Sequence, residues 1–292
     1  MTLSALRSAL ASAYKPGNDE NIDAREARRI ADTLICTRLD LDFTTLICSP
    51  DLTVDEGNVS ALFDMIARVN SGEPVQYVCG KTAFFGRMFA VNKSVLIPRP
   101  DTEILLSEAL SRAREMIDLR PCGQEGFSAL DLCTGSGIIA VSLKLELPGI
   151  RVSAGDISPV ALEIARMNAS NLGANVDFFL SDLFGSLPAS AAFDMIVSNP
   201  PYVADNEFSS LDRSVRCFEP ELALKGGNDG LDFYRRIAAD SPAFLKSGGW
   251  LCLETGETQG PAVSAILAAN GFSDISIQKD LAGRDRVVCA RT

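Results

Sequence analysis

A buried strand that stops at two prolines constrains this chain more than any other feature. The run Phe193–Ser198 is apolar and rich in β-forming residues, and Pro200 and Pro201 follow it after a single asparagine. Each proline lacks an N–H group and has a fixed φ, so the strand must end there. Asn199 therefore stands at the carboxyl end of a buried strand, where open α/β sheets bind their ligands.

The same tetrapeptide offers two hydrogen-bond acceptors and an aromatic ring. The rigid prolines can hold the side-chain oxygen of Asn199 and the carbonyl of Pro200 in fixed positions, and Tyr202 supplies the ring. Such a set suits a planar –NH2 group, as in a carboxamide or a base amine. A loop that merely ends a strand has the same sequence, so the motif alone leaves both interpretations open.

A glycine-bearing turn between a strand and a helix indicates the first unit of a nucleotide-binding sheet. Residues 128–132 predict the strand, Cys133-Thr134-Gly135-Ser136-Gly137 the turn, and residues 138–143 the helix. The glycines allow the backbone to approach a ligand closely. The turn is neither the Gly-x-Gly-x-x-Gly dinucleotide fingerprint nor a P-loop, which argues against a nicotinamide-dependent oxidoreductase.

An acidic residue follows each of the next two predicted strands. The strand over 150–154 leads to Asp156, about twenty residues after the glycine turn, where an acid can accept from both ribose hydroxyls of an adenosine. The strand over 176–180 leads to Asp182, which could accept from an adenine amino group while Leu183 packs beside the base. Each acid could instead be a helix cap or a loop carboxylate.

The composition excludes several classes of chemistry. The 292 residues contain no histidine, so neither a Ser-His-Asp triad nor a histidine metal site can be built. The eight cysteines include no Cys-x-x-Cys pair, which disfavours a disulfide or zinc framework, and we expect no metal. No apolar run reaches eighteen residues and the amino terminus lacks a signal-peptide core, so a cytoplasmic protein without membrane association is expected.

The net charge of −11 bears on the partners. Residues 1–80 hold 7 basic and 12 acidic residues (−5), and residues 81–292 hold 20 and 26 (−6). Such a balance disfavours binding to a phosphate backbone, so we expect no direct contact with nucleic acid.

Periodicity divides the chain into three parts. Three segments have apolar residues at helical spacing and predict a small bundle: 3–14, 23–39 and 55–70. A β-hairpin pattern follows, and then a Pro-Arg-Pro segment with Arg99 at its centre leads into a helix. The predicted domains are a helical docking domain over 1–76, a hairpin linker over 77–95 and a catalytic domain over 96–292.

Assembled, these motifs resemble the S-adenosylmethionine-dependent methyltransferases of the Rossmann-like class, and more narrowly the HemK/PrmC family. The resemblance spans the whole chain. Its motifs are Leu96-Ile97-Pro98-Arg99-Pro100-Asp101-Thr102-Glu103, the glycine turn, Asp156-Ile157-Ser158-Pro159, Asn199-Pro200-Pro201-Tyr202, Glu219-Pro220, and Gly226-Gly227 with Asp229-Gly230-Leu231. Since DNA adenine methyltransferases share Asn-Pro-Pro-Tyr, the Pro-Arg-Pro-Asp-Thr-Glu segment and the Gly-Gly loop are the more specific signals.

The resemblance implies an α/β fold with a seven-stranded Rossmann-like sheet, and an enzyme that methylates the N5 of a glutamine in peptide-chain release factors. It implies S-adenosylmethionine as the cofactor, a release factor as the partner, and a monomer. The cofactor-binding residues that it implies are Arg99, Cys133, Thr134, Gly135, Ser136, Gly137, Asp156, Asp182, Leu183 and Asn199. The implied catalytic residues are Asn199, Pro200 and Tyr202, and with Pro201 they form the substrate site.

Cys133 departs from the family pattern, in which the turn begins with glycine. Cysteine is small, so we expect a modest adjustment provided that this residue does not need a positive φ. A nucleophilic Cys133 is not expected, because methyl transfer to an amide needs no covalent intermediate. The remaining alternatives are an amino-methyltransferase acting on DNA or RNA, methylation of another protein glutamine, and a non-catalytic binding module.

Overall fold

The computed structural model describes residues 1–18, 23–120 and 126–292, which form two compact units. The helical unit comprises residues 1–81 together with 212–218, and the sheet unit comprises 82–211 together with 219–292. The sequence pattern places residues 212–218 in the catalytic domain, and the three domain limits given above stay a prediction.

The helical unit is a bundle with a leucine-rich core. Its helices are α1 (Leu3–Ala13), α2 (Ala24–Leu39), α3 (Phe43–Cys48), α4 (Glu56–Asn70), α5 (Val75–Cys79) and α9 (Arg213–Phe218), with a 3₁₀ turn over Pro16–Asn18. Aspartates cap α2, α3 and α4 by accepting from backbone N–H groups of the first turn, which such helix ends otherwise leave without partners. The structure confirms the three predicted helices as α1, α2 and α4, and it adds α3, α5 and α9.

Helix α9 belongs to the helical unit although it lies far along the chain. The ring of Phe218 packs beside Gly72, which follows α4: a Cβ on Gly72 would stand 3.8 Å from Cε2 of that ring. Gly72 has a φ of +97°, so it is also the residue that can make the turn there. A segment from the middle of the chain thus joins a unit built mainly by the first 81 residues.

The predicted hairpin is present and its turn is tight. Strands β1 (Lys81–Phe84) and β2 (Arg87–Ala90) form a two-stranded sheet. The two residues between them, Phe85 and Gly86, both have positive φ, at +47° and +74°. Two-residue turns of this kind match the right-handed twist of the strands they join. Residues 77–79, which the pattern assigns to the hairpin segment, belong to α5 instead.

The sheet unit is built on seven strands in the order β5-β4-β3-β6-β7-β9-β8, so the predicted fold class is confirmed. The strands are β3 (Ser128–Leu132), β4 (Arg151–Asp156), β5 (Asp177–Leu180), β6 (Phe193–Ser198), β7 (Leu245–Glu254), β8 (Ser273–Lys279) and β9 (Asp285–Arg291). Neighbouring strands are parallel from β5 to β7, and β9 runs antiparallel to both of its neighbours. The chain order reverses between β3 and β6, and ligands bind at such a switch point.

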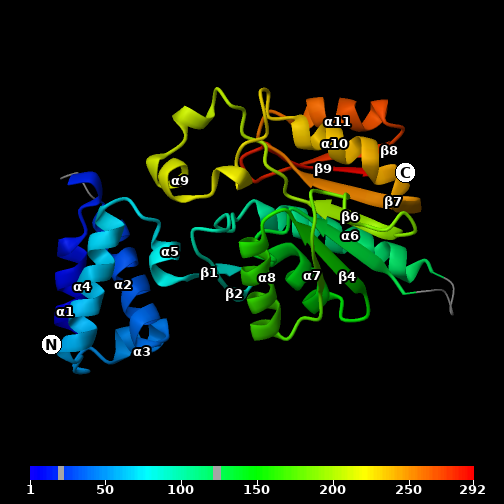
Figure 1. Ribbon diagram of the computed structural model, residues 1–292. Helices are drawn as coiled ribbons and strands as arrows, with labels where there is room; N and C mark the ends of the chain where they lie inside the picture. The colour runs from blue at the N-terminus through cyan, green and yellow to red at the C-terminus, as the bar shows by residue number, and fades with distance from the viewer. Residues whose placement is uncertain (19–22, 121–125) are drawn as a thin grey trace. The chain divides into compact units, whose positions relative to one another are not determined.

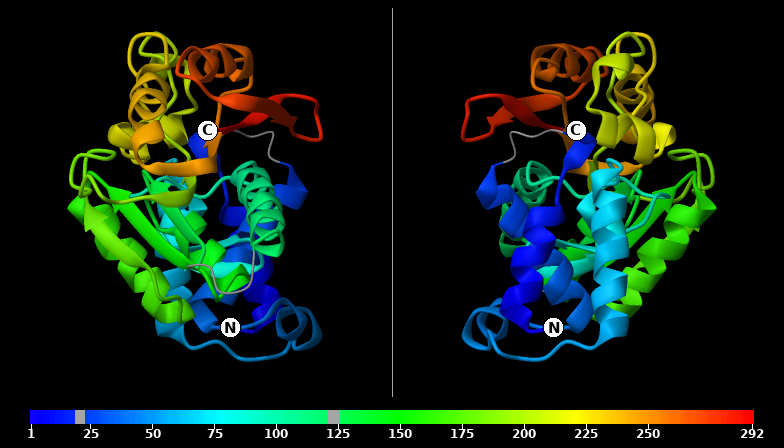
Figure 2. Two further views of the ribbon diagram at one scale, coloured as in Figure 1. Left: turned by 90° about the vertical axis from the view of Figure 1, so that its right-hand side faces the viewer. Right: turned by 90° about the vertical axis from the view of Figure 1, so that its left-hand side faces the viewer.

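Helices cover both faces of this sheet, so its central strands β3 and β6 are buried along their whole length. Figures 1 and 2 show α6 (Thr102–Asp118), α7 (Ile138–Glu146) and α8 (Pro159–Leu172) on one side, and α10 (Asp232–Asp240) and α11 (Gly260–Ala269) on the other. Alternate residues of one strand enter the two cores: Met195 and Val197 pack towards α6 to α8, whereas Ile196 packs towards α10 and α11. Short 3₁₀ turns lie at Phe208–Ser210, Glu221–Ala223 and Ser241–Ala243.

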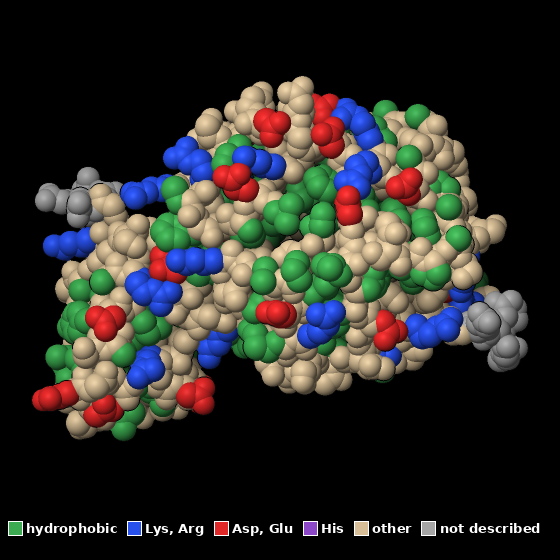
Figure 3. Space-filling view, in the orientation of Figure 1, with side chains coloured by type: hydrophobic (Ala, Val, Ile, Leu, Met, Phe, Trp, Pro, Cys, Tyr) green, Lys and Arg blue, Asp and Glu red, His purple; other side chains and the backbone are tan. Residues whose placement is uncertain are grey.

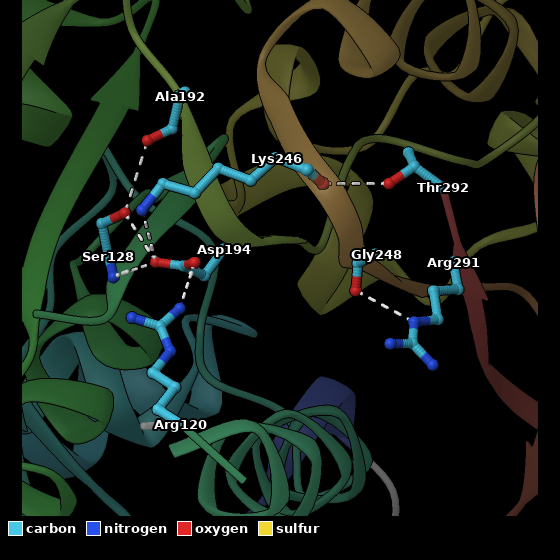
Figure 4. Close-up of polar contacts among 8 residues, drawn as sticks. All are labelled: Arg120, Ser128, Ala192, Asp194, Lys246, Gly248, Arg291 and Thr292. Carbon is cyan, nitrogen blue, oxygen red and sulfur yellow. Dashed lines mark hydrogen bonds and ion pairs between the residues drawn. The ribbon is translucent and has the colours of Figure 1, made fainter. Parts of the chain in front are cut away.

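An ion cluster around Asp194 ties together the amino ends of β3, β6 and β7 (Figure 4). The carboxylate of Asp194 pairs with Arg120 and, at 3.0 Å, with Nζ of Lys246, and it accepts from the backbone N–H of Ser128 at 2.7 Å. Burial raises the pKa of Asp194, but the hydrogen bonds from Ser128 and Lys246 outweigh burial and the pKa is lowered. These ion pairs and hydrogen bonds therefore hold the amino ends of the three strands together, at the side of the sheet opposite their carboxyl ends.

Among residues 1–18, 23–120 and 126–292, no helix is long and apolar enough to cross a membrane. The same residues include seven cysteines, all of them free thiols, and Cys122 lies outside the described ranges.

Candidate active site

The carboxyl ends of β3, β4 and β6 open onto one cavity in the sheet unit. Its volume is about 220 Å³, far above the ~10–15 Å³ that one water needs on the same measure, so it has room for an organic ligand. Ten residues implied by the sequence motifs line it: Arg99, Cys133, Thr134, Gly135, Ser136, Asp156, Asp182, Leu183, Asn199 and Pro201. Gly137, Pro200 and Tyr202 lie near it but are not part of its described wall.

Backbone conformation shapes the glycine turn. Gly135 and Gly137 have φ of +55° and +81°, and a Cβ on Gly137 would come within 3.0 Å of Cβ of Ala165 on α8. Cys133 also has a positive φ, +58°. The condition under which cysteine was expected to fit is therefore not met, and the first position of the turn does use the conformation that suits glycine. A left-handed cysteine costs roughly 1–2 kcal/mol, and such strain gathers at functional sites.

Asp156 at the end of β4 faces the glycine turn directly. One carboxylate oxygen, Oδ2, accepts from the backbone N–H of Gly135 at 2.8 Å, and Oδ1 accepts from that of Ser158 at 2.9 Å. Burial raises the pKa of Asp156 and these two hydrogen bonds oppose the shift. Each oxygen keeps a lone pair for a further donor, so the carboxylate is oriented by the backbone and still able to bind hydroxyls.

A second buried acid, Asp131 on β3, supports the turn from below and was not singled out by sequence. Its Oδ2 accepts from the hydroxyl of Thr134 at 2.6 Å and from the backbone N–H of Ala140 at 3.1 Å. Burial raises its pKa to about 7, against the effect of the Thr134 hydrogen bond. Asp131 thus fastens the turn to the first residues of α7.

Asn168 on α8 also holds the glycine turn in place through hydrogen bonds. It is 1% exposed, accepts from the backbone N–H of Ala90 on β2 at 2.7 Å, and donates to the carbonyl oxygens of Ala90 and Ser136 at 3.0 and 2.8 Å. One amide therefore joins the hairpin, α8 and the glycine turn.

Asp182 and Leu183 follow β5, but the two residues have different surroundings. The carboxylate of Asp182 is half-exposed and pairs with the guanidinium of Arg236 on α10 at 2.8 Å. Leu183 is buried and has a φ of +49°, a strained value for a bulky side chain. The sequence predicts neither the Arg236 pair nor this backbone strain.

The Asn-Pro-Pro-Tyr segment is pressed against a glycine loop. A Cβ on Gly226 would lie 2.7 Å from Cα of Tyr202 and 2.8 Å from the carbonyl oxygen of Pro201, so only glycine fits there. Gln259 at the start of α11 donates to the carbonyl of Tyr202 at 3.0 Å. The Tyr202 ring itself packs with the core towards α10 and α11, and burial raises the pKa of its hydroxyl.

Arg99 is held by a buried carboxylate. Its Nη2 lies 2.5 Å from Oε1 of Glu219, whose Oε2 accepts from the backbone N–H of Ile97 at 3.2 Å. The Glu219 side chain is 1% exposed and that of Arg99 is 33% exposed. Glu219 therefore fixes the Pro-Arg-Pro segment along the cavity, a role that the sequence motif did not reveal.

Asn199 has two buried polar neighbours from distant parts of the chain. Its Nδ2 donates to Oγ1 of Thr102, the first residue of α6, at 3.3 Å. Glu254, the last residue of β7, is 1% exposed, and burial raises its pKa to about 7 against the lowering effect of Thr102 and Asn199. Like Asp156, Glu254 is an acidic residue at the end of a buried strand. The same sequence pattern could therefore have identified it, but it was not predicted as a site residue.

The mouth of the cavity is apolar. Ile157, Val160 and Leu222 line the cavity and are each about half-exposed, at 49%, 48% and 55%. Figure 3 shows apolar side chains gathered over the middle of the visible face of the sheet unit, with charged residues around them. Ligand sites commonly combine such apolar walls with a few fixed polar groups.

The chain is similar to known proteins in both sequence and fold. The model of the family "Methyltransferase small domain" matches residues 106–215, and that of "PrmC N-terminal domain" matches residues 20–80. A release factor glutamine methyltransferase from Koribacter versatilis is 40% identical over 98% of both chains, and one from Neisseria gonorrhoeae is 45% identical over 76% of this chain and 77% of its own. A crystal structure of a methyltransferase from Pyrococcus furiosus, 19% identical, shares the fold with a TM-score of 0.52 over 72% of this chain and 90% of that one.

Proposed function

This chain belongs to the family of release factor glutamine methyltransferases, and from that premise we propose that it methylates the N5 amide nitrogen of a glutamine in a peptide-chain release factor. The observation that carries the proposal is Asn199, whose side chain stands at the end of β6 on the wall of the same cavity as the glycine turn. An acceptor for an amide N–H thus lies in the cavity that a nucleotide-like methyl donor would occupy.

The cavity residues fit S-adenosylmethionine. We assign the ribose hydroxyls to Asp156, whose oxygens are oriented by two backbone N–H groups and keep free lone pairs. The adenine base is assigned to Asp182 and Leu183, and the amino-acid end to the turn Cys133–Gly137 and to Arg99. When bound, this cofactor supplies a methyl group that its sulfonium has already activated.

The protein's part in the reaction is to position and to stabilise charge. A glutamine amide nitrogen is a poor nucleophile because its lone pair is delocalised into the carbonyl. The side-chain oxygen of Asn199 and the carbonyl of Pro200 would each accept one of its N–H bonds and hold the nitrogen in line. Positive charge develops on that nitrogen during methyl transfer, so both hydrogen bonds strengthen most in the transition state. The methylated nitrogen then releases one of its two protons to water, which leaves a neutral N-methyl amide.

No titrating nucleophile takes part in this mechanism. The chain has no histidine, and burial raises the pKa of the Cys133 thiol, which therefore stays protonated at neutral pH. Tyr202 contributes as a packed ring behind the acceptors, since its burial in the core limits the movement of the segment.

We assign the docking of the whole release factor to the helical unit. Phe43 at the start of α3 is 61% exposed and lies at a depression that Arg25, Arg28 and Arg29 also line. Phenylalanine and arginine are both enriched in protein–protein interfaces relative to the rest of the surface. The helical unit would then supply affinity for the folded substrate, and the sheet unit would supply the chemistry.

Transfer of tritium from labelled S-adenosylmethionine to a release factor tests the proposed function. The matched control is the same factor with its loop glutamine replaced by alanine. We expect label on the first protein and none on the second. Equal label on both would refute the glutamine assignment, and label on duplex DNA or RNA instead would favour a nucleic-acid amino-methyltransferase.

A further inference from the structure

A buried carboxylate stands beside Asn199, and the mechanism above does not use it. Glu254 is 1% exposed, and its Oε2 has no hydrogen-bond partner in the described structure. Ser198 pairs with Leu253 across β6 and β7, so Asn199 and Glu254 leave the sheet side by side. A buried carboxylate that is short of partners lowers stability. Stability therefore does not explain why an acid stands here.

Thr102 connects this carboxylate with Asn199. The threonine side chain is fully buried, and its Oγ1 accepts from Nδ2 of Asn199 at 3.3 Å. Both side chains also lie close enough to Glu254 to lower the pKa of its carboxyl group, against the effect of burial. An ionised carboxylate can only accept hydrogen bonds, so the Thr102 proton points to Glu254. The lone pair left on Oγ1 then suits an N–H of Asn199 and not its oxygen.

The direction of these hydrogen bonds matters because the oxygen of a carboxamide accepts hydrogen bonds whereas its NH2 group donates them. An Asn199 side chain that turned its NH2 group outwards would present donors to the donors of the substrate amide. We propose that Glu254 is a positioning residue: through Thr102 it holds the NH2 group of Asn199 inwards and leaves the amide oxygen to accept from the substrate nitrogen. The inference rests on the proposed function, in which that oxygen is the acceptor.

Protonation of Glu254 would remove this fixed orientation of the Asn199 side chain. A carboxylic acid donates to Thr102, whose own proton can then go to the oxygen of Asn199. The amide is free to turn over, and its NH2 group faces the substrate. We therefore expect the rate of methyl transfer to fall at low pH, although neither acceptor of the mechanism, the Asn199 amide and the Pro200 carbonyl, titrates in this range.

The surroundings of Glu254 place this titration near neutrality. Its pKa is raised to about 7: burial and Asp101 raise it, and Thr102, Arg286 and Asn199 act in the opposite direction. Two tyrosines also interact with its charge. They are Tyr202, and Tyr234 on α10, whose hydroxyl donates to the Glu254 carbonyl at 2.9 Å.

Glu254→Gln in the full-length enzyme is the first test, because it keeps the shape and removes the charge. At pH 8, kcat should fall roughly ten- to a hundredfold, as when a catalytic side chain loses the partner that orients it, while KM for S-adenosylmethionine stays unchanged. The acidic limb of the wild-type kcat profile near pH 7 should disappear.

Stability should move the other way. Since the folded-state pKa of Glu254 is raised, its contribution is favourable below the unfolded pKa of about 4.3 and is lost as the pH rises through about 7. E254Q should therefore unfold at a higher temperature than the wild type at pH 8. A carboxylate with a merely structural role would give the opposite shift.

A second pair of variants acts on the hydroxyl. Thr102→Val should reproduce the loss in kcat, and Thr102→Ser should restore the rate. Adding E254Q to T102V should lower kcat no further, because both substitutions interrupt the same series of hydrogen bonds. Wild-type kcat and an unchanged acidic limb in E254Q would overturn the inference. Failure of the wild-type enzyme to label a release factor would instead overturn the proposed function.

Discussion

The contact between Gly226 and the Asn-Pro-Pro-Tyr segment gives a prediction whose size can be worked out from the structure. A Cβ at Gly226 would stand 2.7 Å from Cα of Tyr202, 2.8 Å from the oxygen of Pro201 and 2.9 Å from that of Gly230. Ordinary contact begins at 3.4 Å, so Gly226→Ala requires backbone to move by about 0.5–0.7 Å. None of the three atoms belongs to a flexible side chain, so the segment that carries Asn199 must yield.

A misplacement of about 1 Å near the reacting atoms can cost about 10² in rate, and overpacking costs about 1–3 kcal/mol in stability. We therefore expect G226A to lower kcat roughly ten- to a hundredfold and to lower the unfolding free energy by about 1–3 kcal/mol. Gly149→Ala is the matched control, because its Cβ would meet no atom within 4 Å. Initial rates of tritium transfer and thermal unfolding measure both effects. A folded G226A enzyme with the kcat of the control would refute the argument that this glycine loop positions the acceptors.

Three further predictions follow from the proposed roles. Asn199→Ala should lower kcat by roughly 10²–10³, the loss typical of one preorganised partner of developing charge, while calorimetry shows most of the cofactor affinity retained; an unchanged kcat would remove Asn199 from the mechanism. Asp156→Ala should weaken S-adenosylmethionine binding by about 1–3 kcal/mol through loss of charge-assisted hydrogen bonds, and unchanged calorimetric affinity would move the ribose contact elsewhere. Phe43→Ser should raise KM for a whole release factor roughly fivefold but not KM for a short glutamine-containing peptide, and equal effects on both would contradict docking by the helical unit.

The fold was predictable wherever one element spans enough residues to show its period. The strand Phe193–Ser198 and the helices of the bundle are long and regular, and they were found within a few residues of their ends. Helices α3, α5 and α9 have six, five and six residues. Fewer than two turns do not show a helical period, so such helices form because neighbouring elements pack against them.

The candidate site was also predictable only in part. Asp156 and Asn199 were accessible because each follows directly after a strand, and parallel strands bring their carboxyl ends to one edge. Thr102 lies 97 residues from Asn199, and no local pattern announces a hydrogen bond over that separation. The left-handed backbone of Cys133 was hidden for another reason: φ depends on the turn that encloses the residue, and the sequence shows only that a glycine is missing.

The membership of residues 212–218 in the helical unit has a consequence for the order of events during synthesis. A ribosome that has finished Lys81 must add more than a hundred residues before Phe218 is available to pack beside Gly72. At about 5–20 residues per second this takes on the order of ten seconds. The bundle waits during that time without one of its helices, while the strands up to β6 emerge. The last step of the helical unit is thus delayed until most of the parallel sheet has been made.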